Sequence, residues 1–208
     1  MGQLTMIADI ETPAVVIDIE IVERNLQRWQ DYCDQHGIAN RPHIKTHKLL
    51  ELAQRQVELG AIGITCQKLG EAEVMADVVE DIFLPYNILG PSKLERLVEL
   101  ARRITLSVTA DNSNVVYGLS QAMSQAGLML PVLVECDTGM ARCGVQSPNE
   151  ALALAREIAS LPGLIFAGLM TYPTTSASVA FMAEAKRLIE AYGLTVSIIS
   201  GGGTPQMW

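Results

Sequence analysis

Lys45 lies in a basic octapeptide whose residue types could form a Schiff base with a carbonyl compound. The segment is RPHIKTHK, residues 41–48. If it is a regular strand, His43, Lys45 and His47 point to the same side. Several cationic neighbours then disfavour the ammonium form of Lys45 and make its amine a better nucleophile. Taken alone, the same octapeptide is more typical of a basic surface turn.

A glycine-rich segment near the C-terminus has the composition of an anion-binding loop. Ser200, Gly201, Gly202, Gly203 and Thr204 follow an apolar run. Backbone N–H groups that carry no bulky side chain can close on an anion, and barrels of parallel strands often bind phosphate after strands seven and eight. By itself, a triple glycine is equally typical of a tight turn. Together with a Schiff-base lysine, however, a phosphate-binding loop is what pyridoxal 5'-phosphate (PLP) requires.

Two further polar side chains lie where predicted strands end in the middle of the chain. Arg142 comes after VLVECDTGMA, residues 132–141, and Tyr172 comes after LIFAGLMT, residues 164–171. An arginine in such a place can donate hydrogen bonds to the ring oxygen of a cofactor, and a tyrosine can pack on its ring. The alternatives are a surface salt bridge for Arg142 and a core aromatic for Tyr172.

Elements that would position these residues alternate along the whole chain. Short β-rich runs are separated by amphipathic helical segments, which is typical of βα units around a parallel sheet. We predict a leading strand followed by seven barrel strands, at residues 13–19, 41–46, 61–66, 81–86, 104–110, 131–137, 164–172 and 195–200. Their even spacing favours a (β/α)8 barrel over a doubly wound sheet. Because the chain ends just after the seventh barrel strand, we expect a truncated barrel and a fragment of a longer protein.

Local signals predict where several helices begin and end. Ser92 with Glu95, and Ser147 with Pro148 and Glu150, are typical of helix N-termini. Glycines that precede the next strand are typical of helix C-termini, and here they are Gly37, Gly60, Gly127 and Gly193.

Composition narrows the class of protein. The chain has 208 residues, of which 49% are hydrophobic, so one domain with a substantial core is expected over residues 1–208. Its net charge of -8 argues against a nucleic-acid partner. Polar residues, prolines or glycines interrupt both long uncharged stretches, residues 112–134 and 158–183, so neither predicts a membrane span. We see no signal peptide and expect a cytoplasmic protein.

The four cysteines are scattered and show no spacing that suggests a metal site. We expect Cys33, Cys66, Cys136 and Cys143 to be reduced thiols that pack as small apolar groups. Cys143 follows Arg142, but the sequence places no base beside it that would favour a nucleophilic role.

Two motifs resemble those of PLP enzymes with an alanine racemase-like fold. DTGMARCGV, residues 137–145, is similar to the alanine racemase segment whose arginine contacts the phenolate oxygen of PLP. RPHIKTHK, together with GITCQKLGEAE at residues 63–73, resembles the D-threonine aldolase and D-serine dehydratase branch of that superfamily. The resemblance implies that Lys45 is the Schiff-base lysine and that Arg142 contacts the ring oxygen. It also implies that Gly202, Gly203 and Thr204 bind the phosphate.

Departures from the racemase pattern favour the aldolase and dehydratase branch. The chain lacks the alanine- and tyrosine-rich segment after the lysine, has Glu135 where racemases often have lysine, and has Tyr172 where they have histidine. The segment TYPTTSAS, residues 171–178, also differs from what we expect in that branch. The resemblance therefore implies a PLP-dependent lyase acting on D-β-hydroxy amino acids. An amino-acid racemase and a non-catalytic PLP carrier remain alternatives.

The same resemblance implies features outside this chain. In that branch a divalent metal, zinc or manganese, is held by a C-terminal β domain, and the full-length protein is expected to be a homodimer. The leading strand would pair with that β domain. We therefore expect residues 1–208 alone to lack catalytic competence.

Overall fold

The computed structural model of the chain describes residues 9–203 and divides the chain into two compact units, residues 1–40 and 41–208. The described part of the first unit is built around helix α1 (Ile19–Gln35). A carboxylate oxygen of Asp18 accepts hydrogen bonds from the amides of Glu20 and Ile21, which caps the first turn. The segment after the helix folds back on it. Trp29 Nε1 donates a hydrogen bond to Asn40 Oδ1 over 3.1 Å, which joins the helix to this segment.

The predicted leading strand at residues 13–19 is wrong. These residues have no strand structure, α1 already begins at Ile19, and Val15 is 94% exposed. A strand needs a neighbour to accept and donate its backbone hydrogen bonds. No strand described within residues 9–203 pairs with this segment.

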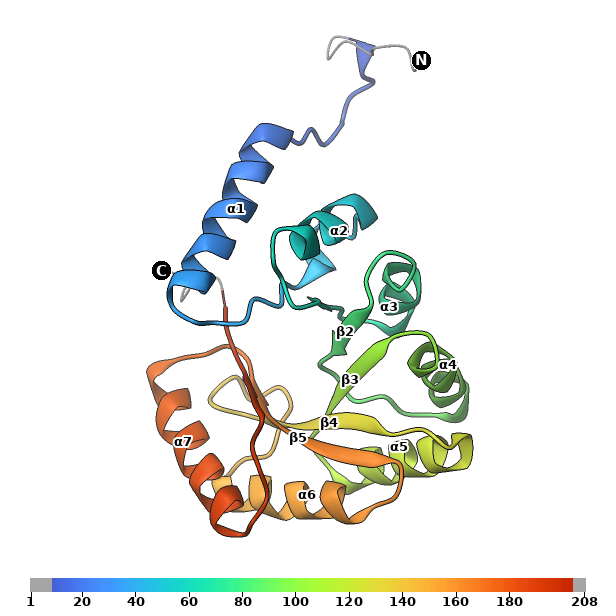
Figure 1. Cartoon of the computed structure of the whole chain (residues 1–208), viewed down its shortest axis with the longest axis vertical. Coiled ribbons are helices and arrows are strands. Elements are labelled where there is room, and N and C mark those ends of the chain that lie inside the picture. The colour runs from blue at the N-terminus through green and yellow to red at the C-terminus, as the bar shows by residue number, and fades with distance from the viewer. Residues whose placement is uncertain (1–8, 204–208) are drawn as a thin grey trace. The chain divides into compact units, whose positions relative to one another are not determined.

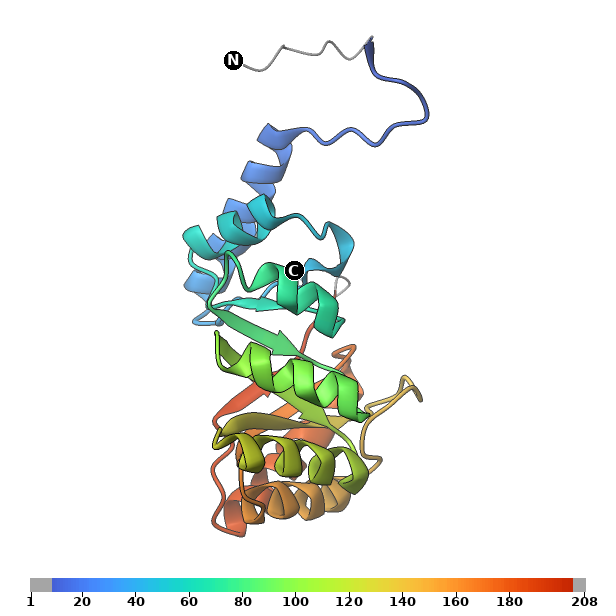
Figure 2. The ribbon, with the colours of Figure 1, turned by 90° about the vertical axis from the view of Figure 1, so that its right-hand side faces the viewer.

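The second unit is a six-stranded parallel sheet whose strands are arranged in chain order, β1-β2-β3-β4-β5-β6 (Figure 1). The strands are β1 (Ile64–Thr65), β2 (Asp81–Leu84), β3 (Thr105–Ala110), β4 (Leu130–Cys136), β5 (Leu164–Thr171) and β6 (Ile198–Ser200). The helices are α2 (Leu50–Glu58), α3 (Leu69–Met75), α4 (Pro91–Ala101), α5 (Ser113–Ala126), α6 (Pro148–Ser160) and α7 (Ser176–Ala191). The sheet curls into part of a barrel, and helices α3 to α6 lie in a row along its outside (Figure 2). The predicted alternation of strands and helices is confirmed.

The predicted strand at residues 41–46 is wrong beyond its start. His43 forms one isolated parallel bridge with Thr65, and the chain then turns into the 3-10 helix η2 (Ile44–Thr46). The Nδ1 atom of His43 accepts the Lys45 amide over 3.3 Å, which satisfies a backbone donor that a strand would need a neighbour to satisfy. His43, Lys45 and His47 therefore do not share one face of a strand.

The two faces of the sheet have different partners. Side chains on the outer face join a large apolar core with the helices, and Ile82, Leu84 and Val108 there are fully buried. The inner face has a separate, smaller apolar cluster of Phe83, Leu133, Ala167 and Met170. Because parallel strands are covered on their outer face and curl around their inner face, central strands such as β4 are buried along nearly their whole length.

Most of the predicted helix boundaries are confirmed. Ser147 accepts the Glu150 amide over 3.2 Å, and Pro148 is the first residue of α6. Gly37, Gly60, Gly127 and Gly193 all have positive φ after helix ends, as expected for residues that reverse the chain there. The Ser92 prediction is wrong, because α4 begins one residue earlier, at Pro91. A proline with its fixed φ suits the first helical position, so the N-cap is Gly90 and Ser92 lies inside the helix.

Candidate active site

The loop after β4, residues 137–145, is held in shape by one aspartate. The Oδ1 atom of Asp137 accepts hydrogen bonds from the amides of Gly139, Met140 and Ala141 over 2.9, 2.9 and 3.1 Å. These amides, Gly139 first, lower the pKa of Asp137 because they stabilise its charged form. These bonds hold the segment DTGMA in a defined turn.

The end of the same loop returns to the strand that it left. Val145 forms a parallel bridge with Cys136, and its amide donates to the Glu135 carbonyl oxygen over 2.9 Å. Gly144 has φ +109°, and a Cβ atom there would collide with the backbone nitrogen of Asp137. Glycine is therefore required for the return. Arg142 thus projects from a short loop that is fixed at both ends.

Arg142 lies between a buried carboxylate and an aromatic ring. Its Nη2 atom is 3.9 Å from Glu135 Oε1, and its Cζ atom is 5.6 Å from the centroid of the Tyr172 ring. The Arg142 side chain is 46% exposed, so it remains accessible to a ligand. The alternative of a simple surface salt bridge does not describe this position, because Glu135 is almost completely buried.

Glu135 is the residue of the site that sequence reasoning noticed only as a departure from the racemase pattern. Its carboxylate accepts the Thr109 hydroxyl over 3.2 Å and the Cys143 thiol over 2.9 Å. Burial and the adjacent carboxylate raise the pKa of Cys143, which keeps the thiol protonated. A base does lie beside Cys143, but the protonated thiol acts as a hydrogen-bond donor to Glu135. The alternation of inward side chains along β4 is the signal that would have placed Glu135 inside the barrel.

Tyr172 brings the predicted catalytic residues together. It follows β5 and is 38% exposed, so it is not a core aromatic. The Lys45 Nζ atom lies 5.2 Å from its ring centroid, and Arg142 lies at the distance given above. Lys45 belongs to η2 and Arg142 to the loop after β4, so two cations from different segments lie near the Tyr172 ring. Lys45, Arg142 and Tyr172 therefore form one cluster at the carboxyl ends of the strands, where barrels carry their active sites.

Lys45 differs from its neighbour Lys48 in its freedom to react. The Lys48 Nζ atom forms an ion pair with Glu71 Oε1 over 2.9 Å, and Glu71 itself accepts the Gln67 amide over 2.9 Å. No carboxylate in residues 9–203 forms an ion pair with Lys45, which is exposed. The Lys45 amine is thus available to a carbonyl ligand, whereas the Lys48 amine is held by a charge.

His43 supports the turn that presents Lys45. Because its Nδ1 atom accepts the Lys45 amide, its Nε2 atom carries the hydrogen and donates to Gln67 Oε1 over 3.3 Å. Burial, followed by the positive charge of Lys45, lowers the pKa of His43. The imidazole is therefore neutral at physiological pH and acts here as a structural cap of η2.

The glycine loop extends from β6. Ser200 pairs with Met170, Gly201 follows it, and Gly202 and Gly203 have φ values of +151° and +148°. The predicted phosphate ligand Thr204 lies outside the described residues. One amide of the loop already has a partner, since the Gly202 N–H donates to Thr174 Oγ1 over 2.6 Å. Thr174 is two residues from Tyr172, so the loop adjoins the segment that carries the cluster.

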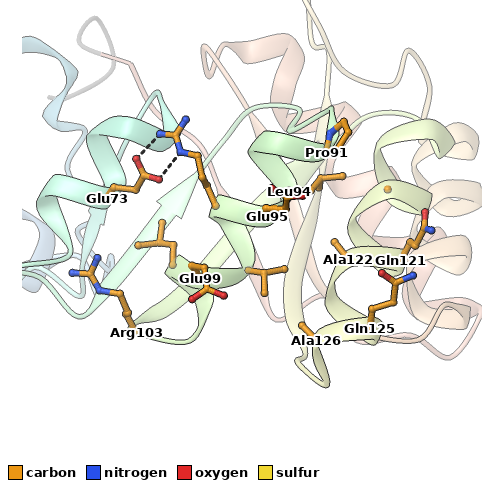
Figure 3. Close-up of a pocket in the computed structure, with 14 residues that line it drawn as sticks. Glu73, Pro91, Leu94, Glu95, Glu99, Arg103, Gln121, Ala122, Gln125 and Ala126 are labelled. Carbon is orange, nitrogen blue, oxygen red and sulfur yellow. Dashed lines mark hydrogen bonds and ion pairs between the residues drawn. The ribbon is translucent and has the colours of Figure 1, made fainter.

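A separate cavity of about 640 Å³ lies between α4 and α5, on the helical side of the sheet (Figure 3). Residues that line it include Leu94, Val98, Arg103, Gln121, Ala122 and Gln125. Lys45, Arg142 and Tyr172 do not line this cavity.

Among residues 9–203, no group of three or more His, Cys, Asp or Glu side chains could hold a metal ion. Within the same residues, no helix combines the length and the apolar character that crossing a membrane requires.

Known proteins are similar to this chain in sequence and in fold over most of its length. A D-threonine aldolase of Arthrobacter sp is 40% identical over 213 residues, a match that covers 95% of this chain and 56% of the relative. The crystal structure of D-threonine aldolase from Filomicrobium marinum superposes with a TM-score of 0.85 at 36% identity, covering 95% of this chain and 58% of that one. D-threo-3-hydroxyaspartate dehydratase from Delftia sp. HT23 superposes with a TM-score of 0.81 at 28% identity, covering 95% and 56%.

The comparisons show how much of each relative this chain covers and to which family the chain belongs. The chain spans little more than half the length of the relatives that it resembles. The family described as alanine racemase, N-terminal domain, matches residues 17–205, which is most of the chain. The chain therefore belongs to the alanine racemase N-terminal domain family, as its motifs predicted.

Proposed function

We propose that this chain forms the cofactor-binding barrel of a PLP-dependent lyase that acts on D-β-hydroxy amino acids. The observation that carries the proposal is the Tyr172 ring, which both Lys45 and Arg142 approach at the carboxyl ends of the strands. The similar proteins named above, an aldolase and a dehydratase, support a lyase of the D-threonine aldolase or D-serine dehydratase type.

The residues present fit PLP in kind. Lys45 offers an amine with no ion-pair partner among residues 9–203. An amine that is not held by a carboxylate is available to attack an aldehyde and form an imine. Arg142 offers guanidinium donors for an anionic oxygen. The glycines of the loop after β6 leave backbone N–H groups accessible to a phosphate. One cofactor thus matches an amine, a cation, an aromatic ring and an anion-binding loop.

Each residue has a distinct role in this proposal. Lys45 holds the cofactor through its amine, Tyr172 packs against the ring, and Arg142 donates to the ring oxygen. The loop of Ser200, Gly201, Gly202, Gly203 and Thr204 binds the phosphate. Bound PLP supplies an electron sink that makes the bonds to the substrate α-carbon easier to break.

The alternative functions have less support. Glu135 is buried and fully engaged with Thr109 and Cys143, at the position where racemases often have a lysine. A non-catalytic PLP carrier is less favoured because the similar proteins that cover 95% of this chain are named as lyases. The zinc or manganese ion, the homodimer and the cytoplasmic location stay proposals for the whole protein.

Chemical labelling tests the assignment of Lys45. The protein is incubated with PLP, reduced with borohydride and digested, and the phosphopyridoxyl label is located by mass spectrometry. We expect the label on Lys45, its loss in Lys45→Ala, and its retention in the matched variant Lys48→Ala. A label on Lys48, or on no lysine, contradicts the proposal.

Activity is tested on the complete natural protein with added PLP and divalent metal. Release of aldehyde from D-threonine, or of pyruvate from D-serine, distinguishes an aldolase from a dehydratase. Racemisation of alanine without either product would instead support the racemase alternative. Residues 1–208, assayed in parallel, are expected to be inactive toward both substrates.

A further inference from the structure

We propose that Thr174 is a positioning residue that holds the glycine loop in the shape that receives the cofactor phosphate. The proposal rests on the PLP-binding function proposed above and adds a residue to it. Thr174 lies in the segment TYPTTSAS, which departs from the pattern expected for the aldolase and dehydratase branch. It follows β5, whereas the loop that it contacts follows β6.

Two hydrogen bonds join Thr174 to the same glycine in opposite directions. The Gly202 amide donates to the Thr174 hydroxyl oxygen over 2.6 Å. The Thr174 amide donates to the Gly202 carbonyl oxygen over 2.9 Å. A glycine with φ near +151° and no side chain is otherwise free to adopt many conformations. These two bonds therefore select one conformation of the loop before any ligand arrives.

The first glycine of the loop is explained by the same hydroxyl group. A Cβ atom at Gly201 would lie 2.6 Å from Thr174 Oγ1, and its next neighbour would be the Thr171 carbonyl oxygen at 3.8 Å. Gly201 lacks the positive φ of Gly202 and Gly203, so its backbone alone does not demand glycine. The close approach of the Thr174 hydroxyl oxygen is what favours glycine at position 201.

The segment that carries Thr174 is itself held firmly. The hydroxyl oxygen of Thr138 lies 2.7 Å from that of Thr171 and 2.7 Å from that of Ser178, so the three groups form a hydrogen-bonded chain with Thr138 in the middle. Ser178 is 1% exposed, and its oxygen also accepts the Thr175 amide over 2.9 Å. Thr174 is therefore adjacent to a buried polar network that fixes the start of α7.

This arrangement links the two ends of the proposed cofactor site. Tyr172, which approaches Lys45 and Arg142, and Thr174, which holds the glycine loop, are separated by one residue, Pro173. It also changes the role of one predicted phosphate ligand, because the Gly202 amide is already used by Thr174. Preorganisation of this kind raises affinity by removing the cost of ordering the loop on binding.

The test compares two variants at position 174. Thr174→Val keeps the shape of the side chain but removes the hydroxyl oxygen, and Thr174→Ser retains the oxygen. In the protein without ligand, we expect hydrogen exchange of the Gly202 amide to become at least tenfold faster in the valine variant and to change little in the serine variant. The loss of one hydrogen bond to a backbone donor predicts this direction.

Ligand binding supplies the second measurement. We expect Thr174→Val to weaken PLP binding roughly fivefold to tenfold. Binding of pyridoxal, which has the same ring and aldehyde but lacks the phosphate, should change by less than about twofold. An equal loss for both ligands would show that Thr174 acts through Tyr172 and would overturn the proposal. Unchanged exchange at Gly202 would overturn it as well.

Gly201 offers an independent check. Gly201→Ala should weaken PLP binding in the otherwise natural protein, because the added methyl group meets Thr174 Oγ1. In a Thr174→Ala background the same change should cost less than about twofold, and a full cost there would contradict the proposed contact. If the natural protein binds neither PLP nor pyridoxal, the function proposed above fails. The exchange rate of Gly202 still decides whether Thr174 holds the loop.

Discussion

The two faces of the sheet are formed by the same strands, yet they differ in composition and in role. On the outer face, fully buried residues such as Leu84 and Val132 pack against the helices in one continuous apolar core. On the inner face, the apolar cluster is small, and Thr109 and Glu135 are polar and buried beside it. Apolar burial stabilises the fold, whereas buried polar groups cost free energy unless they are paired. The comparison indicates that the outer face maintains the fold and that the inner face positions Arg142.

A substitution on the outer face should have the largest effect on stability. Leu84→Ala removes a fully buried side chain from β2 and leaves a cavity, so the free energy of unfolding should fall by about 2–5 kcal/mol. Denaturant unfolding measures this change. The control is Ser107→Ala on the inner face of β3, for which we expect a change within about 0.5 kcal/mol. Similar losses in both variants would contradict the division between the faces.

Removal of Glu135 should have an intermediate effect. Glu135→Ala leaves the Thr109 hydroxyl and the Cys143 thiol without their acceptor, and should lower the free energy of unfolding by about 1–3 kcal/mol. Glu135→Gln retains an acceptor oxygen and should cost less. Thermal unfolding of the protein without cofactor measures both variants. An equal loss for the two variants would show that the charge of Glu135, and not its hydrogen-bond acceptors, is what matters.

Replacement of Arg142 should affect the cofactor far more than the fold. Arg142→Ala removes a half-exposed side chain, while Thr109 and Cys143 still donate to Glu135, so apo stability should change by less than about 1 kcal/mol. Under the proposed function, the absorption spectrum of bound PLP and the turnover of the complete protein should both change, because the ring oxygen would lose the donor that we assign to Arg142. Collapse of apo stability would instead identify Arg142 as structural.

The smallest expected effect is the loss of stability of the loop after β4 when the pH is lowered. The pKa of Asp137 is lowered in the folded protein by the Gly139 amide and its neighbours, so the loop gains stability above the ordinary aspartate pKa near 4. This contribution is lost as the pH falls from about 4 through the lower folded pKa. NMR shifts of the Gly139 and Ala141 amides should report the transition, and Asp137→Asn should abolish it. Shifts that do not depend on Asp137 would assign the transition to another group.

Periodicity and local chemistry were enough to predict much of the fold. The βα alternation from residue 61 onward is visible because buried strands and amphipathic helices have different apolar patterns. Ser147 and the helix-ending glycines are visible because capping depends on neighbouring residues only. Residue type and strand-end position likewise indicated Lys45, Arg142 and Tyr172 as candidates, and the structure brings these three together.

Tertiary structure decided the features that depend on a partner distant in sequence. Residues 13–19 have the composition of a strand but lack a neighbour among the described residues, and residues 41–46 turn after a single bridge because His43 caps η2. The carboxylate of Glu135 meets Thr109 of another strand, and Thr174 meets Gly202, 28 residues away. Local pattern specifies which backbone a segment prefers, whereas these contacts exist only once the sheet has set the register of its strands.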